Sequence, residues 1–440
     1  MFSLPFVISN LIQSLYSVAD MIIVGQFSGT ISMSGVNIGS QITLVVTNMI
    51  VGLCAGATVL IAQYLGAGDR HAIKQTVGTL FTSLIVFALV ITALLLVFKK
   101  PFLVLLQTPT ESFSEADDYL LITTIGTIFI FGYNALSAVM RGLGDSKRPL
   151  VFVAIACVIN VFLDILLVAK FKMGAMGAGI ATVISQAISM FLCVFYLSKN
   201  NFIFDFKLKS FGFHKERLKM LIKIGIPTSV QNVAVGISFL FLTAMVNSLG
   251  VIASAAVGAV AKYNGFAILP CVAISSSVSA MSAQNIGAGE MKRARKTMEI
   301  GILISFAISF VIFIFSQIFP EQILKIFADD EQMAIAGTEY LRVFSFDYIF
   351  VPLVFSMNGL FIGAGHTKFT LFNSMLSSLL IRIPVSYIFG IVMHKGLMGV
   401  GLGAPFASSI ALILCIIFFA TGKWKKMVIL KKDMAEIKSE

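Results

Sequence analysis

Two acidic residues lie inside long apolar stretches of the sequence, where a charged group is unusual. Asp20 is the one charged residue of the stretch 2–24, and Asp164 is the one charged residue of 149–169. An ionised carboxylate costs roughly 2.5–3.5 kcal/mol at the centre of a membrane helix, so such a residue faces protein or water and marks a candidate functional site. We therefore expect Asp20 and Asp164 to carry the chemistry of this chain.

The two acids belong to a larger set of oxygen-bearing side chains. Asn160 precedes Asp164 by one helical turn, so both project from one face of their helix. Counted along the helices from Pro5 and from Arg148, the two carboxylates lie at similar depths, about 22 and 24 Å, and Thr182 lies near the level of Asn160. Hard cations such as Na⁺ take oxygen ligands, and two close carboxylates in a low dielectric hold a proton because they do not both ionise easily.

A purely structural role is the alternative for each of these residues. Neighbouring backbone and hydroxyl donors would then cap Asp20 and Asp164, while Asn160 and Thr182 would join helices by hydrogen bonds. Pro5 lies fifteen residues before Asp20. A proline inside a helix removes one backbone hydrogen bond and bends the chain, so we expect a bent first helix that holds the Asp20 carboxylate.

The composition indicates an all-helical membrane protein. Of the 440 residues, 58% are hydrophobic and 12% are charged, whereas a soluble domain carries about 25% charged residues. No cleavable signal peptide is visible. The five cysteines fall inside apolar runs, and the four histidines show no metal-ligand spacing. We expect no metal other than Na⁺ and no organic cofactor.

Twelve apolar stretches are long enough to cross a bilayer as helices. Most of the 32 Lys and Arg lie in alternate connections between them and in the C-terminal tail, which places both termini in the cytoplasm by the positive-inside rule. The net charge of +11 then marks a membrane face and does not indicate nucleic-acid binding. The stretches are 2–25, 36–63, 76–98, 119–140, 149–169, 175–198, 220–248, 253–282, 299–319, 340–362, 369–393 and 398–422.

The chain is also an internal repeat. Four short patterns recur in order at an offset of 221 or 222 residues: 63–69 with 284–290, 142–147 with 363–368, 174–179 with 396–401, and Pro5 with Pro227. Six spans per repeat is an even number, so both copies keep one orientation, and a pseudo-two-fold axis along the membrane normal relates them. We expect two six-helix lobes, 1–206 and 207–422, followed by a basic cytoplasmic tail, 423–440.

The second lobe differs chemically from the first. The counterparts of Asp20 and Asp164 are Leu242 and Ser386. Lys262, Asp347 and Arg382 instead place charges in its spans. Two interpretations stay open: a neutralising cluster that fixes packing, and a cluster that gates substrate or relays protons.

Several of these stretches together resemble one family, multidrug and toxic compound extrusion (MATE), over nearly the whole chain and closest to its DinF-like branch. The matching parts are Pro5 with 20–25, 63–68, 141–149, Asn160 with Asp164, and 177–182. The resemblance implies two lobes around a V-shaped cleft that alternates between faces, with H⁺ or Na⁺ entry driving export of cationic amphipathic drugs. It also implies a first-lobe cation site at Asp20, Asn160, Asp164 and Thr182, to which a bend at Pro5 responds.

The NorM-like branch of that family has an acidic residue in span seven. Residues 220–248 contain none, so we do not expect a second-lobe Na⁺ site of that kind. We predict a monomeric, multi-pass secondary transporter of the inner membrane that exports small organic cations or drugs by H⁺ or Na⁺ antiport.

Three other functions were weighed against this one. A lipid-linked oligosaccharide flippase of the same superfamily is the alternative, but it would need a strongly basic cleft, and the buried charges of the first lobe are acidic. An enzyme would need a nucleophile–base pair or a metal centre, and the sequence indicates neither. The two-lobe repeat does not favour a channel.

Overall fold

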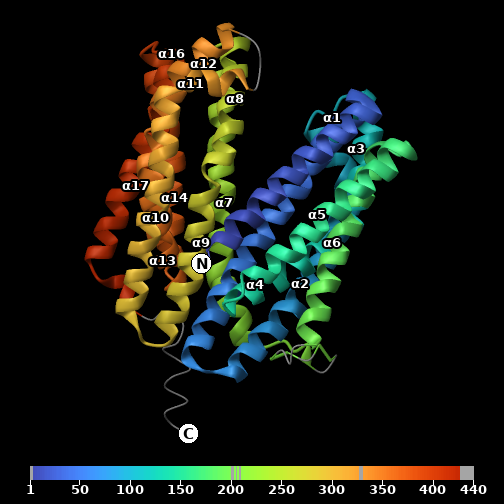
Figure 1. The fold of residues 1–440 in the computed structure, drawn as a ribbon, viewed down its shortest axis with the longest axis vertical. Helices are drawn as coiled ribbons and strands as arrows, with labels where there is room; N and C mark the ends of the chain where they lie inside the picture. Colours follow the sequence, from blue (N-terminus) through green and yellow to red (C-terminus); the bar gives the residue numbers. More distant parts are fainter. Residues whose placement is uncertain (1–2, 200–202, 205, 208–209, 327–330, 427–440) are drawn as a thin grey trace. The chain divides into compact units, whose positions relative to one another are not determined.

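The computed structural model describes residues 3–199, 203–204, 206–207, 210–326 and 331–426. Every regular element in these ranges is a helix, and no strand occurs in them (Figure 1). Nine helices of the described residues are long and apolar enough to cross a membrane, and two bent helix pairs raise that number to eleven. The all-helical membrane fold expected from the composition is confirmed.

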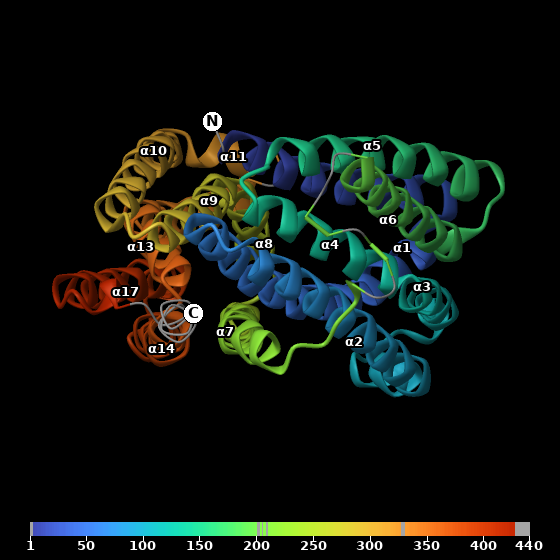
Figure 2. The same cartoon turned by 90° about the horizontal axis from the view of Figure 1, so that it is seen from below.

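The chain folds into two compact units, one up to Ser229 and one from Val230 onward. The helices of the first unit are α1 (Ser3–Ala67), α2 (Arg70–Leu105), α3 (Phe113–Ile125), α4 (Thr127–Gly142), α5 (Lys147–Asp164) with the π-helical turn η2 (Ile165–Lys170), and α6 (Gly174–Lys199). A short 3-10 turn, η1 (Thr110–Ser112), precedes α3. Figure 2 shows α5 and α6 side by side along α1, with which both make contact.

The second unit repeats this order. Its elements, starting with the helix that joins it to the first unit, are α7 (Lys215–Asn247), α8 (Val251–Ala267), α9 (Leu269–Gly287), α10 (Met291–Ile318), α11 (Pro320–Lys325), α12 (Glu331–Phe344), α13 (Asp347–Gly363), α14 (Thr367–Met375), η4 (Leu376–Arg382), α15 (Ile383–Tyr387), η5 (Ile388–Val392), α16 (Gly396–Gly401), α17 (Gly403–Ala420) and η6 (Lys423–Lys425). η4 and η5 are π-helical turns.

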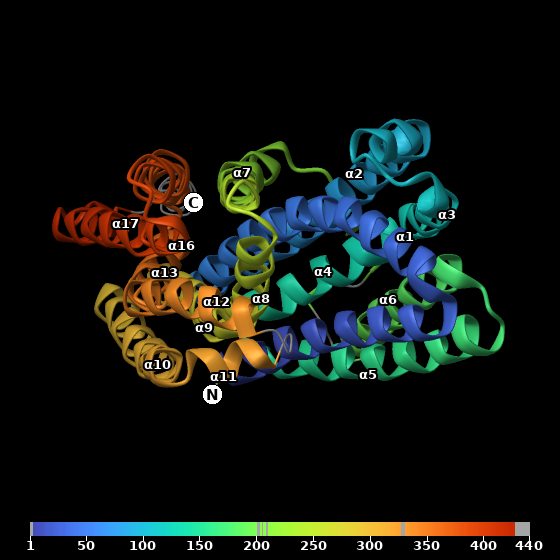
Figure 3. The ribbon, with the colours of Figure 1, turned by 90° about the horizontal axis from the view of Figure 1, so that it is seen from above.

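Helix α1 contains two of the predicted spans. Its 65 residues would extend about 100 Å as one straight helix, and a bilayer core is about 30 Å thick. The backbone leaves the helical region at Gly29, with φ 83° and ψ −179°. Glycine takes such a positive φ without the steric cost that a side chain would bring. Figure 3 shows the ribbon of α1 doubling back between its violet start and its blue end.

Two other spans are broken rather than straight. α3 and α4 meet at an angle of 50°, and α12 and α13 meet at 45°. Each pair covers one predicted stretch, 119–140 and 340–362. Counting each bent pair once and α1 twice, all twelve predicted stretches lie on helices.

The repeat is visible in the backbone as well as in the sequence. Left-handed positions recur at the offset of 221 or 222 residues, and a π-helical turn lies near the end of span five (η2) and of span eleven (η5). Short sharp turns that only these conformations allow therefore fix the span ends in both copies. The paired positions are Gly29 with Gly250, Gly68 with Gly289, Gly144 with Gly365, Lys172 with His394, and Gly174 with Gly396.

The first unit extends further along the chain than the predicted lobe 1–206. The first turns of α7 pack against the second arm of α1, where Ser229 Oγ donates to Met49 O at 2.8 Å. Glycines make this approach close, because a Cβ on Gly52 would lie 2.0 Å from Ser229 Oγ. The division by contacts consequently falls inside α7, 23 residues after residue 206.

Candidate functional site

Helix α5 presents its polar residues on one face and its apolar residues on the other. Asn160 and Asp164 are 1% and 0% exposed and follow Val153 and Ala156 on the buried face. Val158 and Phe162 lie on the opposite face and are exposed. This is the i, i+3, i+4 pattern of a helix that turns one side to the protein and one to lipid. The buried face packs against α1 and α6.

The Asp20 carboxylate of α1 faces the Asp164 carboxylate of α5 within hydrogen-bonding reach. Asp20 is 7% exposed. Both oxygens of Asp164 and Oδ1 of Asp20 have no donor partner among the described residues. Two ionised carboxylates cannot bond to each other, because each only accepts hydrogen bonds. A proton or a cation between them would relieve the repulsion of two ionised groups.

Asn160 lies on α5, the helix of Asp164, and Thr182 lies on α6, which packs against both α1 and α5. Neither amide atom of Asn160 has a partner in the described part of the chain, so its carbonyl oxygen is available to a ligand. Thr182, in α6, lies within hydrogen-bonding reach of the Tyr119 side chain of α3. We call Asp20, Asn160, Asp164 and Thr182 the acid-pair site.

Three further polar side chains surround this site and were missed by the sequence analysis. Tyr16 lies within hydrogen-bonding reach of Gln186 and close to Asp20, and Tyr119 lies close to both acids. Tyr16 is one helical turn before Asp20, and Gln186 is one turn after Thr182. The same i, i+4 argument that joined Asn160 to Asp164 would have found both of them.

An apolar cluster closes the site on one side. Val24 and Val168 lie one turn beyond Asp20 and Asp164, and they pack with Val36, Tyr119, Ala175 and Ala178 into a buried core. On α6 the order is reversed, because Ala178 of the core comes one turn before Thr182 of the site. The core and the acid-pair site therefore form successive layers along all three helices. Charges beside such an apolar core interact more strongly than they would in water.

The backbone changes directly after Asp164. α5 ends at this residue and continues as the π-helical turn η2. Single π turns inside helices occur often at functional sites, because the extra residue re-aims the neighbouring side chains. Here the turn follows the residue that holds the second carboxylate.

Pro5 does not break the helix in this structure. Up to Gly29 the described residues of α1 keep helical φ and ψ angles, and Gly29 is the one departure. Pro5 is the third residue of the helix as described and is buried.

The charges predicted for the second lobe divide into two places. Asp347, at the break between α12 and α13, is buried within range of the Arg382 charge and of the Ser408 hydroxyl. Arg382 ends the π-helical turn η4, and its guanidinium lies 5.1 Å from the Phe239 ring centroid. No ion pair joins Asp347 and Arg382, and Oδ1 of the acid and Nε and Nη1 of the base have no partner in the described ranges. Lys262, in α8, is exposed.

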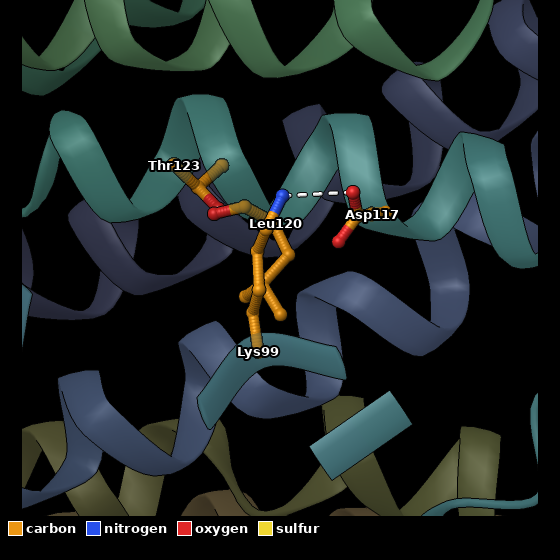
Figure 4. Close-up of polar contacts among 4 residues, drawn as sticks. All are labelled: Lys99, Asp117, Leu120 and Thr123. Carbon is orange, nitrogen blue, oxygen red and sulfur yellow. Dashed lines mark hydrogen bonds and ion pairs between the residues drawn. The ribbon is translucent and has the colours of Figure 1, made fainter. Parts of the chain in front are cut away.

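Helix α3, which carries Tyr119, is held in place by two acidic side chains. Lys99 Nζ of α2 donates to Asp117 Oδ2 at 2.7 Å, and the two side chains are 17% and 20% exposed (Figure 4). Glu115 Oε2 accepts from the backbone N–H of Ala175 at 2.7 Å, at the start of α6. Both acids precede the predicted stretch 119–140, because α3 begins already at Phe113.

Comparisons with known proteins agree with this architecture. The model of the family MatE matches residues 5–166 and 227–388, once in each repeat. Among curated proteins, "Probable multidrug resistance protein YpnP" of Bacillus subtilis is 28% identical over 432 residues, covering 97% of this chain and 95% of that protein. "Probable multidrug resistance protein NorM" of Thermotoga maritima is 25% identical, covering 98% and 93%.

Solved structures show the same fold. The "Crystal structure of MATE in the bent conformation" superimposes with a TM-score of 0.89 at 23% identity, covering 99% of this chain and 96% of the other. The outward-facing conformation of a multidrug resistance MATE transporter gives a TM-score of 0.90 at 21% identity. The repeated family match, the twelve helical spans and these neighbours together establish that the chain is a multi-pass membrane transporter that belongs to the MatE family.

Proposed function

We propose that this protein is a secondary active exporter of small amphipathic organic cations, driven by entry of H⁺ or Na⁺ at the acid-pair site. One observation carries the proposal: Asp20 and Asp164 face each other in a buried place where both oxygens of Asp164 and Oδ1 of Asp20 have no donor among the described residues. Such a pair holds a proton or a monovalent cation and releases it when its surroundings change.

The donor set accommodates either coupling ion. A proton needs only the two carboxylates, one as donor and one as acceptor. Na⁺ would use the oxygens of Asp20 and Asp164 with the unpartnered Asn160 carbonyl and the Thr182 hydroxyl, because hard cations take oxygen ligands. The ion would bring positive charge between the two acids. These four side chains would form its coordination shell and exclude bulk water.

Coupling follows from differential binding. An ion shifts the balance between inward-open and outward-open states only as far as it binds one state more tightly than the other. α1, α5, α6 and α3 all contribute side chains near the acids. Their relative positions therefore determine the affinity for the ion, and by reciprocity the ion biases those positions.

The substrate class rests on the relatives and on the composition. Several relatives carry multidrug resistance or export names, and one from Shewanella oneidensis is named an FAD transporter. With 40 Phe and 20 Met the chain offers apolar, adaptable surfaces that suit substrates of varied shape. We place the protein in the bacterial inner membrane as a monomer, with both termini in the cytoplasm on the distribution of its Lys and Arg.

The test is transport in sealed proteoliposomes. Efflux of a fluorescent organic cation is followed under an imposed H⁺ gradient and, separately, under an imposed Na⁺ gradient. The wild type is compared with Asp20→Asn and Asp164→Asn, and Asp118→Asn serves as the control because Asp118 is an exposed acid of the same unit. Each variant is first checked for an unchanged elution profile and melting temperature.

The expected result is transport under one of the two gradients, lost in both site variants and kept in Asp118→Asn. The gradient that works identifies the coupling ion. Transport that persists in both site variants would reduce the acids to structural residues. An inactive wild type under both gradients would contradict cation-coupled efflux itself.

A further inference from the structure

A cavity lies in the first unit, apart from the acid-pair site. Its volume is about 230 Å³. Side chains of α2, α4 and α6 line it, with Phe206 and Phe211 from the segment that leads to α7, and no charged residue is among them. An apolar cavity of about 150 Å³ stays free of water and holds a benzene-sized molecule. This larger one has room for a stretch of hydrocarbon.

Phe206 and Phe211, described residues between α6 and α7, line one end of the cavity. Phe204, Phe206 and Phe211 pack around Phe81 of α2, with ring centroids 5.6, 5.9 and 6.2 Å from that of Phe81. The segment runs close over α2 because Gly78 has no side chain: a Cβ there would lie 2.5 Å from Ser210 O. We call the described residues 203–214 the strap.

Hydrogen bonds fix the end of the strap to α2. The backbone N–H of His214 donates to Thr79 Oγ1 at 3.2 Å. One residue further on, α7 begins at Lys215, and Arg217 Nε donates to Gln75 Oε1 at 3.2 Å. The aromatic closure of the cavity and the first basic turn of α7 are thus held on the same helix, α2.

The cavity opens through a mouth at the surface of the first unit. Ile85 of α2 and Ile128 of α4 line it and are 41% and 38% exposed. Phe191 and Phe195, on the same helix as the lining residue Met190, are exposed as well. Large apolar side chains exposed on a membrane-spanning helix contact acyl chains, since no water is present at that depth.

Positive charge lies next to the closed end. Lys207 follows the lining residue Phe206, and Lys215 and Lys219 stand one turn apart at the start of α7, all three exposed. Basic side chains beside the end of a membrane helix attract anionic lipid headgroups, at about 1 kcal/mol each near the surface. Apolar space at membrane depth below a basic edge is the arrangement that an anionic lipid fits.

We propose that this cavity binds one acyl chain of an anionic phospholipid, whose headgroup lies against the basic residues of the strap and of the first turn of α7. The bound chain fills the space between α2, α4 and α6 and packs on Phe81, Phe206 and Phe211. This lipid site is separate from the acid-pair site and does not rest on the proposed transport function.

The test uses photocrosslinking in vesicles. The full-length protein is reconstituted with a trace of phosphatidylglycerol that carries a diazirine near the end of one acyl chain, and crosslinked peptides are identified by mass spectrometry. The same diazirine chain on phosphatidylcholine measures the contribution of the headgroup. We expect labelling of α4 around 128–136 and of α6 around 190–194, stronger with the anionic lipid.

Two variants close the cavity, and one control variant adds a ring outside it. Ala135→Phe fills it from the wall, and Ile128→Trp narrows the mouth at an exposed position that folding tolerates more easily. Ala93→Phe adds the same ring on an exposed face of α2 outside the cavity. We expect the labelling of 128–136 and 190–194 to fall about five-fold or more in the two cavity variants, because the added ring takes the room of the chain, and to stay unchanged in Ala93→Phe.

The headgroup is tested by charge. Lys215→Gln with Lys219→Gln should remove the preference for phosphatidylglycerol. Lys292→Gln with Lys296→Gln, an exposed pair of the same spacing in the first turns of α10, should leave it. Labelling that ignores both cavity variants, or misses both peptides, would overturn the acyl-chain site. Equal labelling by the two headgroups, or displacement of the lipid by a transported dye, would overturn an anionic lipid as its occupant.

Discussion

The two repeats share a backbone but differ in the groups that could bind an ion. At the offset of 222 residues, Asn160 corresponds to Arg382 and Asp164 to Ser386. Neither carboxylate oxygen of Asp164 has a hydrogen-bond partner within the described part of the chain, whereas Ser386 Oγ donates to Val400 O at 2.9 Å. The second copy thus satisfies this position internally, and the first leaves it open to a ligand.

The remaining positions follow the same division. Asp20 corresponds to Leu242 and Thr182 to Ala404, both apolar and buried in the second copy. Its buried acid comes instead from Asp347, which corresponds to Gly126 at the bend of the first broken span. A few side chains therefore make the difference between the copies. The first copy has a candidate ion site, and the second copy has the Arg382 guanidinium as a permanent positive charge of the chain itself.

The largest effect is expected when the first copy is given the residue of the second. Asp164→Ser should reduce gradient-driven transport to background, because Asp20 would lose the second carboxylate with which it shares the coupling ion. Ser386→Ala, at the corresponding position, should change transport less than about two-fold, a barrier change below about 0.5 kcal/mol. The measurement is initial efflux rate in proteoliposomes. Equal losses in the two variants would end the proposed asymmetry.

Infrared spectroscopy can detect the proton that the acid pair requires. In Na⁺-free buffer at neutral pH we expect a protonated-carboxyl C=O band that disappears in Asp20→Asn and in Asp164→Asn, because each removes one member of the pair. Asp118→Asn should retain it. If the coupling ion is Na⁺, adding Na⁺ should remove the band from the wild type. A wild type without the band in any buffer would contradict a shared proton.

The charges of the second copy should matter for stability more than for coupling. Asp347→Leu leaves the half-buried Arg382 without its nearby acid and should lower the free energy of unfolding by about 2 kcal/mol. The double variant Asp347→Leu with Arg382→Leu should recover part of this loss, since it removes both charges from the membrane. Melting temperatures in detergent give the comparison. Additive losses in the double variant would show that the two charges act independently.

The smallest effect is expected at the ion pair between Lys99 and Asp117 in the first copy. Lys99→Met breaks the ion pair with Asp117, whose counterpart in the second copy is the uncharged Thr338. Partly exposed ion pairs contribute about 0.5–1 kcal/mol, so a shift of a few degrees in melting temperature is expected. Transport should persist, because Glu115 still joins α3 to α6. Complete loss of transport would give Lys99 a role beyond holding α3.

The sequence predicts the fold well because its signals are long and repeated. Apolar stretches of membrane length and glycine motifs at one offset need no knowledge of tertiary contacts, and all twelve stretches lie on helices. The unit boundary depends instead on packing, because Gly52 lets α7 approach α1 closely. Helix periodicity can place such residues on a face but cannot identify the element against which they pack.

The same limit applies to the candidate site. Depth counting along two helices puts Asp20 and Asp164 at one level, and the structure has them facing each other. Counting cannot supply Tyr119, because that residue comes from α3, a helix whose start the acidic run 111–118 hides. Depth counting also cannot predict that Lys262 is exposed while Asp347 is buried near Arg382. That difference depends on the direction in which each side chain leaves its helix.

The π-helical turn η2 contains one residue more than a normal helical turn would hold, directly beyond Asp164. The position of this extra residue sets how the side chains on either side of it are rotated about the helix axis. If it passed to the other side of Asp164, the side chain would rotate by about 100° around the α5 axis, the angle between successive residues. The carboxylate would then point away from Asp20, and the two acids would separate. A shift of one residue in η2 would therefore be enough to open the acid-pair site, while Lys147 and Lys170 kept their positions.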